Sequence, residues 1–363
     1  MLANRVCHEG DKVWIEGVEG FCCDQYASSV HGSQTRMLQT LGESLTYEDL
    51  IGYSGFAFRV GWHEVGCPSA GHPCCGYRCI ENSIRALPWQ LKMYESSPWC
   101  KPKGDRGAFE AQACAAIKAS IDRGVPVHYG REEDGLIMGY ADEGQRWLCV
   151  HPYNKGGSET FWHDEASGFA GGAWPWIIVV WTGPKALEDR VDGRDLLTAA
   201  LKQAVDMWGH QTDLDPDHRP ERVYFTGDMA YAPWIGWLRA IEVGELEDPK
   251  AGIQGNAWCF HVLVHSRRIA SRWLTQQADR LEGQAHQHLL DAAGHYQKLV
   301  DVCMKDLDSS WALAPGPGQF DQWTSAMRTE QIARLQVAQQ HDANAIDAIT
   351  KALATQTMSF DTP

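Results

Sequence analysis

The pattern of apolar residues changes near residue 185, and this change limits the fold more than any other feature of the chain. Before it lie glycine-rich turns and short apolar runs such as "GLIMGY" and "WIIVVW", which are typical of strands. After it, apolar residues recur with the 3.6-residue period of amphipathic helices. We therefore expect two domains, residues 1–185 and 186–363, with the boundary in "WTGPKALEDRVDG".

The first domain is predicted to be α+β. The segment "SSVHGSQTRMLQTLG" predicts a helix that stops at Gly42, and "AFEAQACAAIKASIDRG" predicts a second helix that stops at Gly124. The segment "VPVHYG" is expected to be a strand, followed by a hairpin over residues 131–153 and by the strand "WIIVVW". One early helix with an antiparallel sheet behind it makes an α+β domain.

The second domain is predicted to be an all-α helical bundle. Periodic segments predict helices over residues 195–208, 228–243, 256–282, 284–307 and 322–354. The breaker "APGPG" separates the last two of them. Long amphipathic helices of this kind form a bundle, and their outer faces would also suit a homo-oligomer.

The amino-acid composition limits the classes of partner that the chain is expected to bind. The chain has 32 basic and 47 acidic residues, and its net charge of −15 repels phosphate backbones and anionic lipid surfaces. We therefore expect no nucleic-acid or membrane partner. No apolar stretch approaches the roughly 20 residues that cross a bilayer, and the start "MLANRVCHEGDKVW" lacks the apolar run of a signal peptide. A cytoplasmic protein whose twelve cysteines are reduced thiols is the expectation.

Several segments of the first domain occur in an order found in papain-like hydrolases. An early helix ends in Leu-Gly and precedes "SLTYEDLIGYSGFAFR", a later helix ends in "DRGVPV", and "GLIMGY" follows. This order resembles the N-terminal domain of the butirosin-biosynthesis acyltransferase family and, more distantly, the double-glycine leader peptidases. The likeness covers roughly residues 20–155, and the helical second part with "YFTGDMAYAPWIGWL" is similar to an extension of the former family.

The resemblance implies a nucleophile at the start of the first helix. Those families place a Cys there, because the helix N-terminus and a neighbouring imidazolium lower the pKa of the thiol. Counting back from the end of the helix, that position falls on Ser28 or Ser29 in this chain. Cys22 and Cys23 lie about two turns upstream, and Cys23 could serve if the helix instead begins after Asp24 as its cap.

The resemblance also implies a His on the first strand of the hairpin and an Asp or Asn at the end of the second. Counting back from Gly139 and Tyr140, the His position falls on Glu133, with Asp134 beside it. The Asp position falls on His151. None of the three expected residue types stands in its expected place.

Three interpretations remain open at this point. Ser29 or Cys23 could form a triad with His151 and Glu133 in which base and orienting group are exchanged. His128 could supply the base from the adjacent strand. Alternatively, the triad has been lost, and the protein is a pseudoenzyme. The implied function is therefore hydrolase or acyltransferase chemistry on an amide or thioester, or non-catalytic binding of a small molecule or peptide.

Other functional side chains are candidates for binding a ligand. We expect Ser28, His128 and Asp134 near the substrate in the first domain, together with Arg59 as a partner for an acidic ligand. In the second domain, Asp228, Tyr231 and Trp234 are expected to line an aromatic pocket between the domains. No glycine-rich phosphate loop is present, so no nucleotide or other cofactor is expected.

The sequence contains two groups of potential metal ligands, but we expect neither to bind a metal. The segment "GWHEVGCPSAGHPCCGYRC" (residues 61–79) concentrates His and Cys but lacks the two separated ligand pairs of common zinc modules. His261 and His265 share a helix face, and His286, His288 and His295 follow on a later helix. Because no Glu-x-x-His motif accompanies them, we expect packed or exposed histidines and no metal site.

Overall fold

The protein divides into two compact units. The computed structural model describes residues 5–95, 106–131, 133–152, 161–164, 175–215, 219–316 and 318–358. The first unit comprises Met1–Leu50 and Leu87–Arg190, and the second comprises Ile51–Ala86 and Val191–Pro363. The boundary near residue 190 lies close to the predicted one, but residues 51–86 belong to the second unit, which a single division of the chain does not allow.

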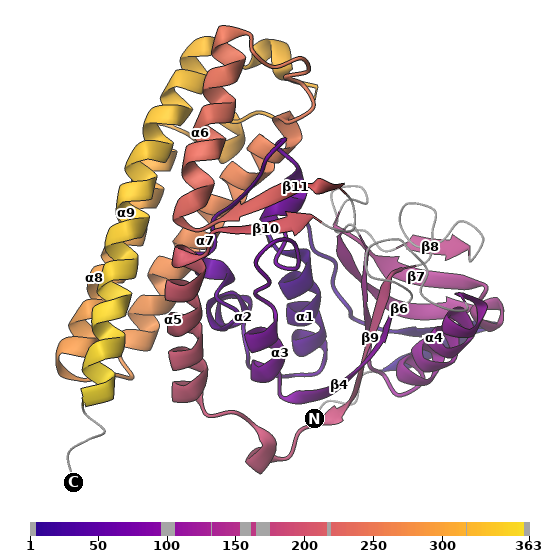
Figure 1. Cartoon of the computed structure of the whole chain (residues 1–363). Helices are drawn as coiled ribbons and strands as arrows, with labels where there is room; N and C mark the ends of the chain where they lie inside the picture. Colours follow the sequence, from indigo (N-terminus) through magenta and orange to yellow (C-terminus); the bar gives the residue numbers. More distant parts are fainter. Residues whose placement is uncertain are drawn as a thin grey trace. The chain divides into compact units, whose positions relative to one another are not determined.

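An antiparallel sheet forms most of the first unit. Its described strands are β1 (Val6–Glu9), β2 (Lys12–Ile15), β4 (Trp89–Glu95), β5 (Val127–Gly130), β6 (Asp134–Ala141), β7 (Arg146–Val150), β8 (Phe161–Asp164) and β9 (Ile177–Pro184). Their order is β1-β2-β6-β5-β9-β4, with β7 paired to β6 and β8 paired to β7. Figure 1 labels β6, β7 and β8, which lie next to one another. The predicted hairpin is β6 and β7. With both helices and an antiparallel sheet, the protein is α+β, as predicted.

Two helices of the first unit end where the sequence predicts. The elements are α1 (Ser29–Thr40), α4 (Arg106–Ile121) and the short 3-10 helices η3 (Asp142–Gly144) and η4 (Leu187–Asp189), while α2 (Tyr47–Tyr53) spans the division at Leu50. After α1, Gly42 adopts φ +71°, and the Glu43 N–H donates to the Leu38 carbonyl. Gly124 plays the same part after α4 with φ +75°. Both are left-handed helix caps that glycine adopts without steric cost.

The second unit is mainly helical. Its helices are α3 (Glu81–Ala86), α5 (Gly193–Gly209), α6 (Asp228–Val243), α7 (Ile253–Ala278), α8 (Gly283–Met304) and α9 (Ser325–Met358), with the 3-10 helices η1 (Phe56–Phe58), η2 (Pro68–Gly71), η5 (Ser310–Ala312) and η6 (Phe320–Gln322). The five predicted helices are thus confirmed to within a few residues. The second unit also contains a small sheet in the order β10-β11-β3, formed by Thr212–Asp215, Arg219–Thr226 and Gly61–His63. The prediction of an all-α second domain was therefore incomplete.

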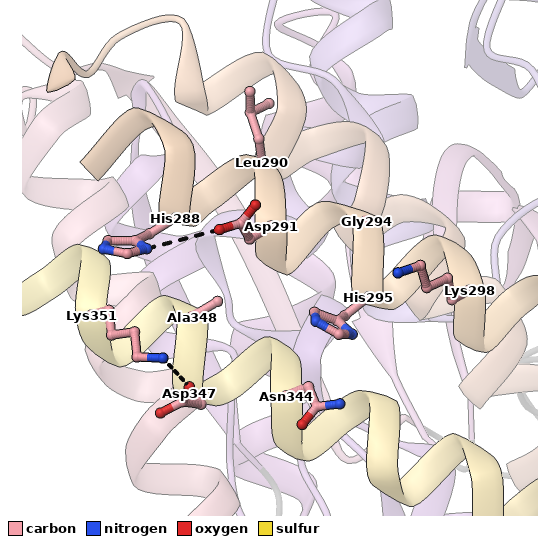
Figure 2. Close-up of a pocket in the computed structure, with 10 residues that line it drawn as sticks. All are labelled: His288, Leu290, Asp291, Gly294, His295, Lys298, Asn344, Asp347, Ala348 and Lys351. Carbon is pink, nitrogen blue, oxygen red and sulfur yellow. Dashed lines mark hydrogen bonds and ion pairs between the residues drawn. The ribbon is translucent and has the colours of Figure 1, made fainter. Parts of the chain in front are cut away.

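Helices α8 and α9 lie along each other and enclose a polar groove. Figure 1 shows the two helices side by side, in orange and yellow. The groove has a volume of about 530 Å³ and is open to solvent (Figure 2). The polar side chains that line it are His288, Asp291, His295, Lys298, Asn344, Asp347 and Lys351.

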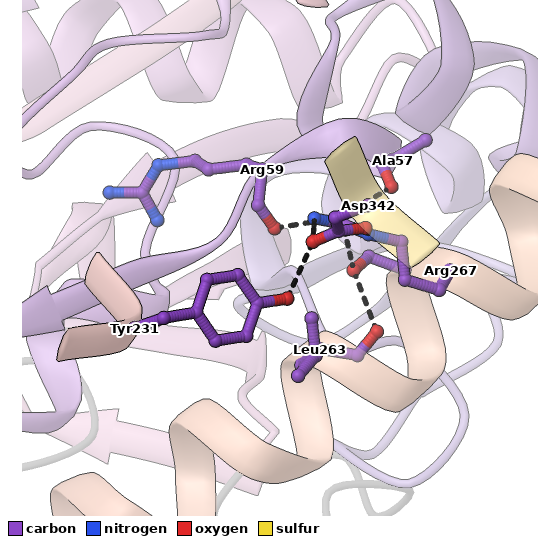
Figure 3. A network of polar contacts seen from close by, with 7 residues as sticks. Ala57, Arg59, Tyr231, Leu263, Arg267 and Asp342 are labelled. Carbon is purple, nitrogen blue, oxygen red and sulfur yellow. Dashed lines mark hydrogen bonds and ion pairs between the residues drawn. The ribbon is translucent and has the colours of Figure 1, made fainter. Parts of the chain in front are cut away.

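A buried arginine holds residues 51–86 in the second unit. The guanidinium of Arg267 on α7 forms a two-pronged ion pair with Asp342 on α9, with N···O distances of 2.6 and 2.7 Å (Figure 3). Its remaining nitrogen donates to the carbonyls of Ala57 and Arg59 at 2.9 and 3.0 Å. Burial alone would lower the pKa of Arg267, but Asp342 outweighs it and raises the pKa. The cation is therefore fully paired, as a buried charge must be.

No helix among the described residues is long and apolar enough to cross a membrane.

The first turn of α7 makes a close backbone approach that tests the packing of the second unit. A methyl group at Gly255 would overlap the backbone of Gly66. We therefore expect Gly255→Ala to destabilise the second unit by about 1–3 kcal/mol, since backbone must move to make room. The measurement is the free energy of unfolding from denaturant titration, followed by the helical circular dichroism signal.

Gly236 on α6 provides the matched control. It is exposed, and a methyl group there would meet nothing within 4 Å. Gly236→Ala should therefore stabilise the same unit by about 0.5–1 kcal/mol through the lower entropy of the unfolded chain. Equal effects of the two substitutions would contradict the close approach at Gly255.

Candidate functional site

The N-terminus of α1 is held by a set of buried polar contacts. Ser28 is the N-cap, with extended φ −121° and ψ 110°. Its backbone N–H donates to the Tyr47 hydroxyl at 3.1 Å, and its Oγ lies 2.7 Å from Nδ1 of His31. Ser29, the first residue of α1, follows with only 3% of its surface exposed. The chain thus places two adjacent serine hydroxyls at the positive end of a helix dipole.

Ser29 joins the helix to the turn between β5 and β6. The Ser29 hydroxyl donates to Oε2 of Glu133 and accepts from the backbone N–H of Asp134 at 3.0 Å. The carbonyl of Glu133 accepts from the Arg131 N–H at 3.2 Å, which closes the tight turn. Helix α1 and strands β5 and β6 therefore meet at this point, as the predicted site requires. A carboxylate facing a helix N-terminus is electrostatically favourable.

His128 binds Asp134 and not Ser29. Nε2 of His128 lies 2.6 Å from Oδ1 of Asp134, and both side chains are buried. In the register of the two strands, His128 pairs with Leu136 and Tyr129 pairs with Gly135. Since side chains alternate across a sheet, His128 and Asp134 share one face, and Tyr129 points to the other.

His151 lies against Tyr129. The two rings stack with centroids 6.2 Å apart and an interplanar angle of 20°, and His151 is 6% exposed. Val150, the last residue of β7, pairs with Leu136, so His151 follows one step along the register, beside Gly135. Glycine is needed at 135 because a methyl group there would overlap the Tyr129 ring. The imidazoles of His128 and His151 thus lie on opposite faces of the sheet.

Cys23 does not sit at the start of the helix. The carbonyl of Cys22 accepts from the N–H groups of Gln25 and Tyr26 at 3.1 and 3.0 Å, so Cys23 and Asp24 lie in a turn. The alternative in which α1 begins after Asp24 is therefore wrong, because the first helical residue is Ser29. Burial raises the pKa of the Cys23 thiol, and the nearby carboxylate of Asp24 raises it further. An activated thiol requires the opposite shift.

Arg59 has a structural role in the second unit. Its side chain is 2% exposed, and its guanidinium donates to the carbonyl of Ala70 and, at 2.6 Å, to that of Cys75. Both carbonyls belong to the cysteine-rich segment 61–79. The guanidinium of Arg59, which was predicted to bind an acidic ligand, therefore binds backbone carbonyls of segment 61–79 and holds that segment in place.

The remaining predicted ligand residues are also bound within the second unit. The Tyr231 hydroxyl donates to Asp342 at 2.6 Å, and the Trp234 indole donates to Asn256 at 2.7 Å. Both side chains are fully buried. Asp228 accepts from Gln339 at 2.7 Å at the surface. Tyr231 and Trp234 therefore build the core of the helical unit, and their predicted place in a pocket between the domains stays a prediction.

The cysteine and histidine residues of segment 61–79 make contacts such as that of His72 with Cys75, but they do not form a set of three metal ligands. His63 lies edge-on to Tyr224, and the N–H of Cys74 donates to Nδ1 of His72 at 3.2 Å. Burial raises the pKa of the Cys79 thiol to about 12. Across the part of the chain that the structure describes, no group of three or more His, Cys, Asp or Glu residues is placed to hold a metal ion.

His31 and Tyr47 are members of this site that the sequence did not reveal. His31 stands three residues after Ser28, the spacing at which an N-cap residue meets the third residue of its helix. That spacing could have identified the contact. Tyr47 comes from a separate helix, and its burial raises the pKa of its hydroxyl, with no sequence signal for either.

No protein-family model matches the chain, and no curated protein matches it either. The site therefore has to be interpreted from its own geometry.

The raised pKa of the Cys23 thiol predicts that this thiol reacts slowly at neutral pH. Only the thiolate is alkylated, so a raised pKa leaves less reactive thiolate at neutral pH. In a Cys22→Ser variant, we expect iodoacetamide to alkylate Cys23 more slowly at pH 7 than it alkylates N-acetylcysteine. The rate should rise with pH to a midpoint above that of an ordinary cysteine thiol, because burial and the Asp24 carboxylate raise the pKa. Peptide mass spectrometry measures the labelling, and fast labelling independent of pH would instead indicate a preformed thiolate.

Proposed function

We propose that the protein is a papain-like serine hydrolase or acyltransferase that acts on an amide or thioester, with Ser29 as its nucleophile and Glu133 as its base. One observation carries the proposal: the hydroxyl of Ser29, at the N-terminus of α1, donates a hydrogen bond to the Glu133 carboxylate. These are the two positions at which the resemblance places nucleophile and base. Their contact supports the alignment that identified them.

The chemistry follows from the geometry of that contact. The Ser29 oxygen would attack the carbonyl carbon, its proton would pass to Glu133, and the leaving amine or thiol would take that proton as the acyl group forms an ester on Ser29. Water or an acceptor amine would then release the acyl group. The N–H groups in the first turn of α1 lack partners within the helix, and such groups can stabilise an oxyanion.

Free thiols support a cytoplasmic setting for this chemistry. No disulfide joins two of the eleven cysteines in the described residues. Reduced thiols are usual in the cytosol.

A second candidate function is binding without catalysis. The Ser29 hydroxyl donates its hydrogen bond to Glu133 and also accepts one from the Asp134 N–H at 3.0 Å, and all three residues are buried. A buried hydroxyl that both donates and accepts a hydrogen bond can hold a helix against a sheet without taking part in a reaction. In that case the fold would hold a small molecule or peptide, and no acyl group would be transferred.

A fluorophosphonate probe separates the two candidates. An active Ser29 should react with the probe, and Ser29→Ala should abolish labelling of the full chain. Glu133→Gln keeps the size and a polar contact of the side chain but removes the base, so labelling should slow by about 10²–10⁴-fold. Intact-protein and peptide mass spectrometry locate and time the adduct.

Ser33→Ala is the matched control. Ser33 lies one turn further along α1, and its buried hydroxyl has no hydrogen-bond partner among the described residues. This variant should fold and label as the wild-type chain does. A folded wild-type chain that the probe does not modify would overturn the proposal and favour the binding function. An adduct on Ser28 would overturn the assignment of Ser29 and move the nucleophile to its neighbour.

A further inference from the structure

We propose that His295 on α8, which lines the polar groove, and His341 on α9 form a binding site for a divalent transition-metal ion of the zinc class. Nδ1 of His295 lies 3.4 Å from Nδ1 of His341, and the two residues are 46 positions apart in the chain. Both imidazoles are partly exposed and belong to the same unit. The argument rests on this facing pair of nitrogens and on what surrounds it.

The separation of the two nitrogens suits a shared metal ion better than a shared proton. A hydrogen bond from N–H usually spans roughly 2.7–3.2 Å, so a distance of 3.4 Å is long for one. Two nitrogens bound to zinc at about 2.0–2.1 Å with a tetrahedral angle lie about 3.3 Å apart. The helices therefore hold the imidazoles at nearly the spacing that a tetrahedral ion requires.

The pair is also available to a ligand. Neither imidazole makes another hydrogen bond or ion pair with a described residue, and the rings lie with centroids 5.7 Å apart. Figure 2 shows His295 directed from α8 toward the groove. Burial lowers the pKa of both histidines, and the neighbouring Lys298 lowers it further. Neutral imidazoles are the form that coordinates metal.

The rest of the groove sets the coordination. Asp291 lies one turn before His295 on the same helix face and lines the groove. Its carboxylate forms an ion pair with His288, with Oδ2 and Nδ1 3.9 Å apart, drawn as a dashed line in Figure 2. Two protein ligands leave the remaining positions for water, since no third His, Cys, Asp or Glu among the described residues is placed to join them. Lys298, one turn after His295, opposes any cation in the groove, so its charge limits the affinity.

Cobalt(II) is the probe for this site, because tetrahedral cobalt absorbs visible light and its spectrum distinguishes imidazole from thiolate ligands. Titrating the full chain should give saturable binding of one ion, with visible absorption and no thiolate charge-transfer band in the near ultraviolet. Zinc added afterwards should displace the cobalt. His295→Ala and His341→Ala should each weaken cobalt binding by at least about tenfold. Losses of this size are usual even for residues that only hydrogen-bond to a metal ligand.

Two further variants make the test specific. His288→Ala removes a histidine of the same groove that is outside the pair, and its affinity for cobalt should equal that of the wild type. Lys298→Gln removes the opposing charge, so it should tighten binding. Weaker binding in the variants of the histidine pair and tighter binding in Lys298→Gln are changes in opposite directions, which a loss of folding cannot produce. The thermal unfolding midpoint without metal checks separately that each variant folds.

Three results would overturn the proposal. They are no saturable binding of cobalt to the folded chain, affinity that is unchanged in both His295→Ala and His341→Ala, and a spectrum dominated by thiolate ligands. The last result would assign the ion to cysteines elsewhere in the chain.

Discussion

The buried guanidinium of Arg267 is the constraint on which the second unit depends. A charge in the interior must be paired at every nitrogen, because removing one partner of a buried pair typically costs about 3–5 kcal/mol. Asp342 supplies the anion from α9, and the carbonyls of Ala57 and Arg59 take the remaining donor. Arg59 in turn holds the carbonyls of Ala70 and Cys75. The contacts of Arg267 with Arg59, and of Arg59 with Ala70 and Cys75, thus link residues 51–86 to the helices. They explain why this segment is part of the helical unit.

Periodicity predicted the helices and the hairpin, because each depends on residues close in sequence. The glycine caps at Gly42 and Gly124 are local in the same way. The position of residues 51–86 depends instead on Arg267, which lies more than 200 positions from the Ala57 and Arg59 carbonyls that it binds, and no local pattern contains that information. The small sheet was missed for the same reason. Its strand Gly61–His63 pairs with residues 224–226, and three residues are too few for an alternating pattern.

The candidate site was predictable where it depended on spacing and not where it depended on side-chain direction. Counting residues placed Ser29 and Glu133 together, and their hydroxyl–carboxylate contact agrees with that alignment. Counting could not show that His128 and His151 lie on opposite sides of the sheet, since that follows from the register of β5, β6 and β7. It also could not show that Ser29 accepts the N–H of Asp134. This second bond determines whether the hydroxyl is poised to react or serves as a tie.

The histidines of the second unit show the same limit in another form. Histidine pairs on one helix can be found from a spacing of three or four residues, and by that criterion His295 has no histidine partner. Its partner is His341, on the helix that packs beside it, and the register of α8 against α9 brings the two together. Packed helices are held about 8–10 Å apart, a distance that two imidazoles can bridge from opposite sides. A pair of this kind arises from helix packing, so only the three-dimensional structure can reveal it.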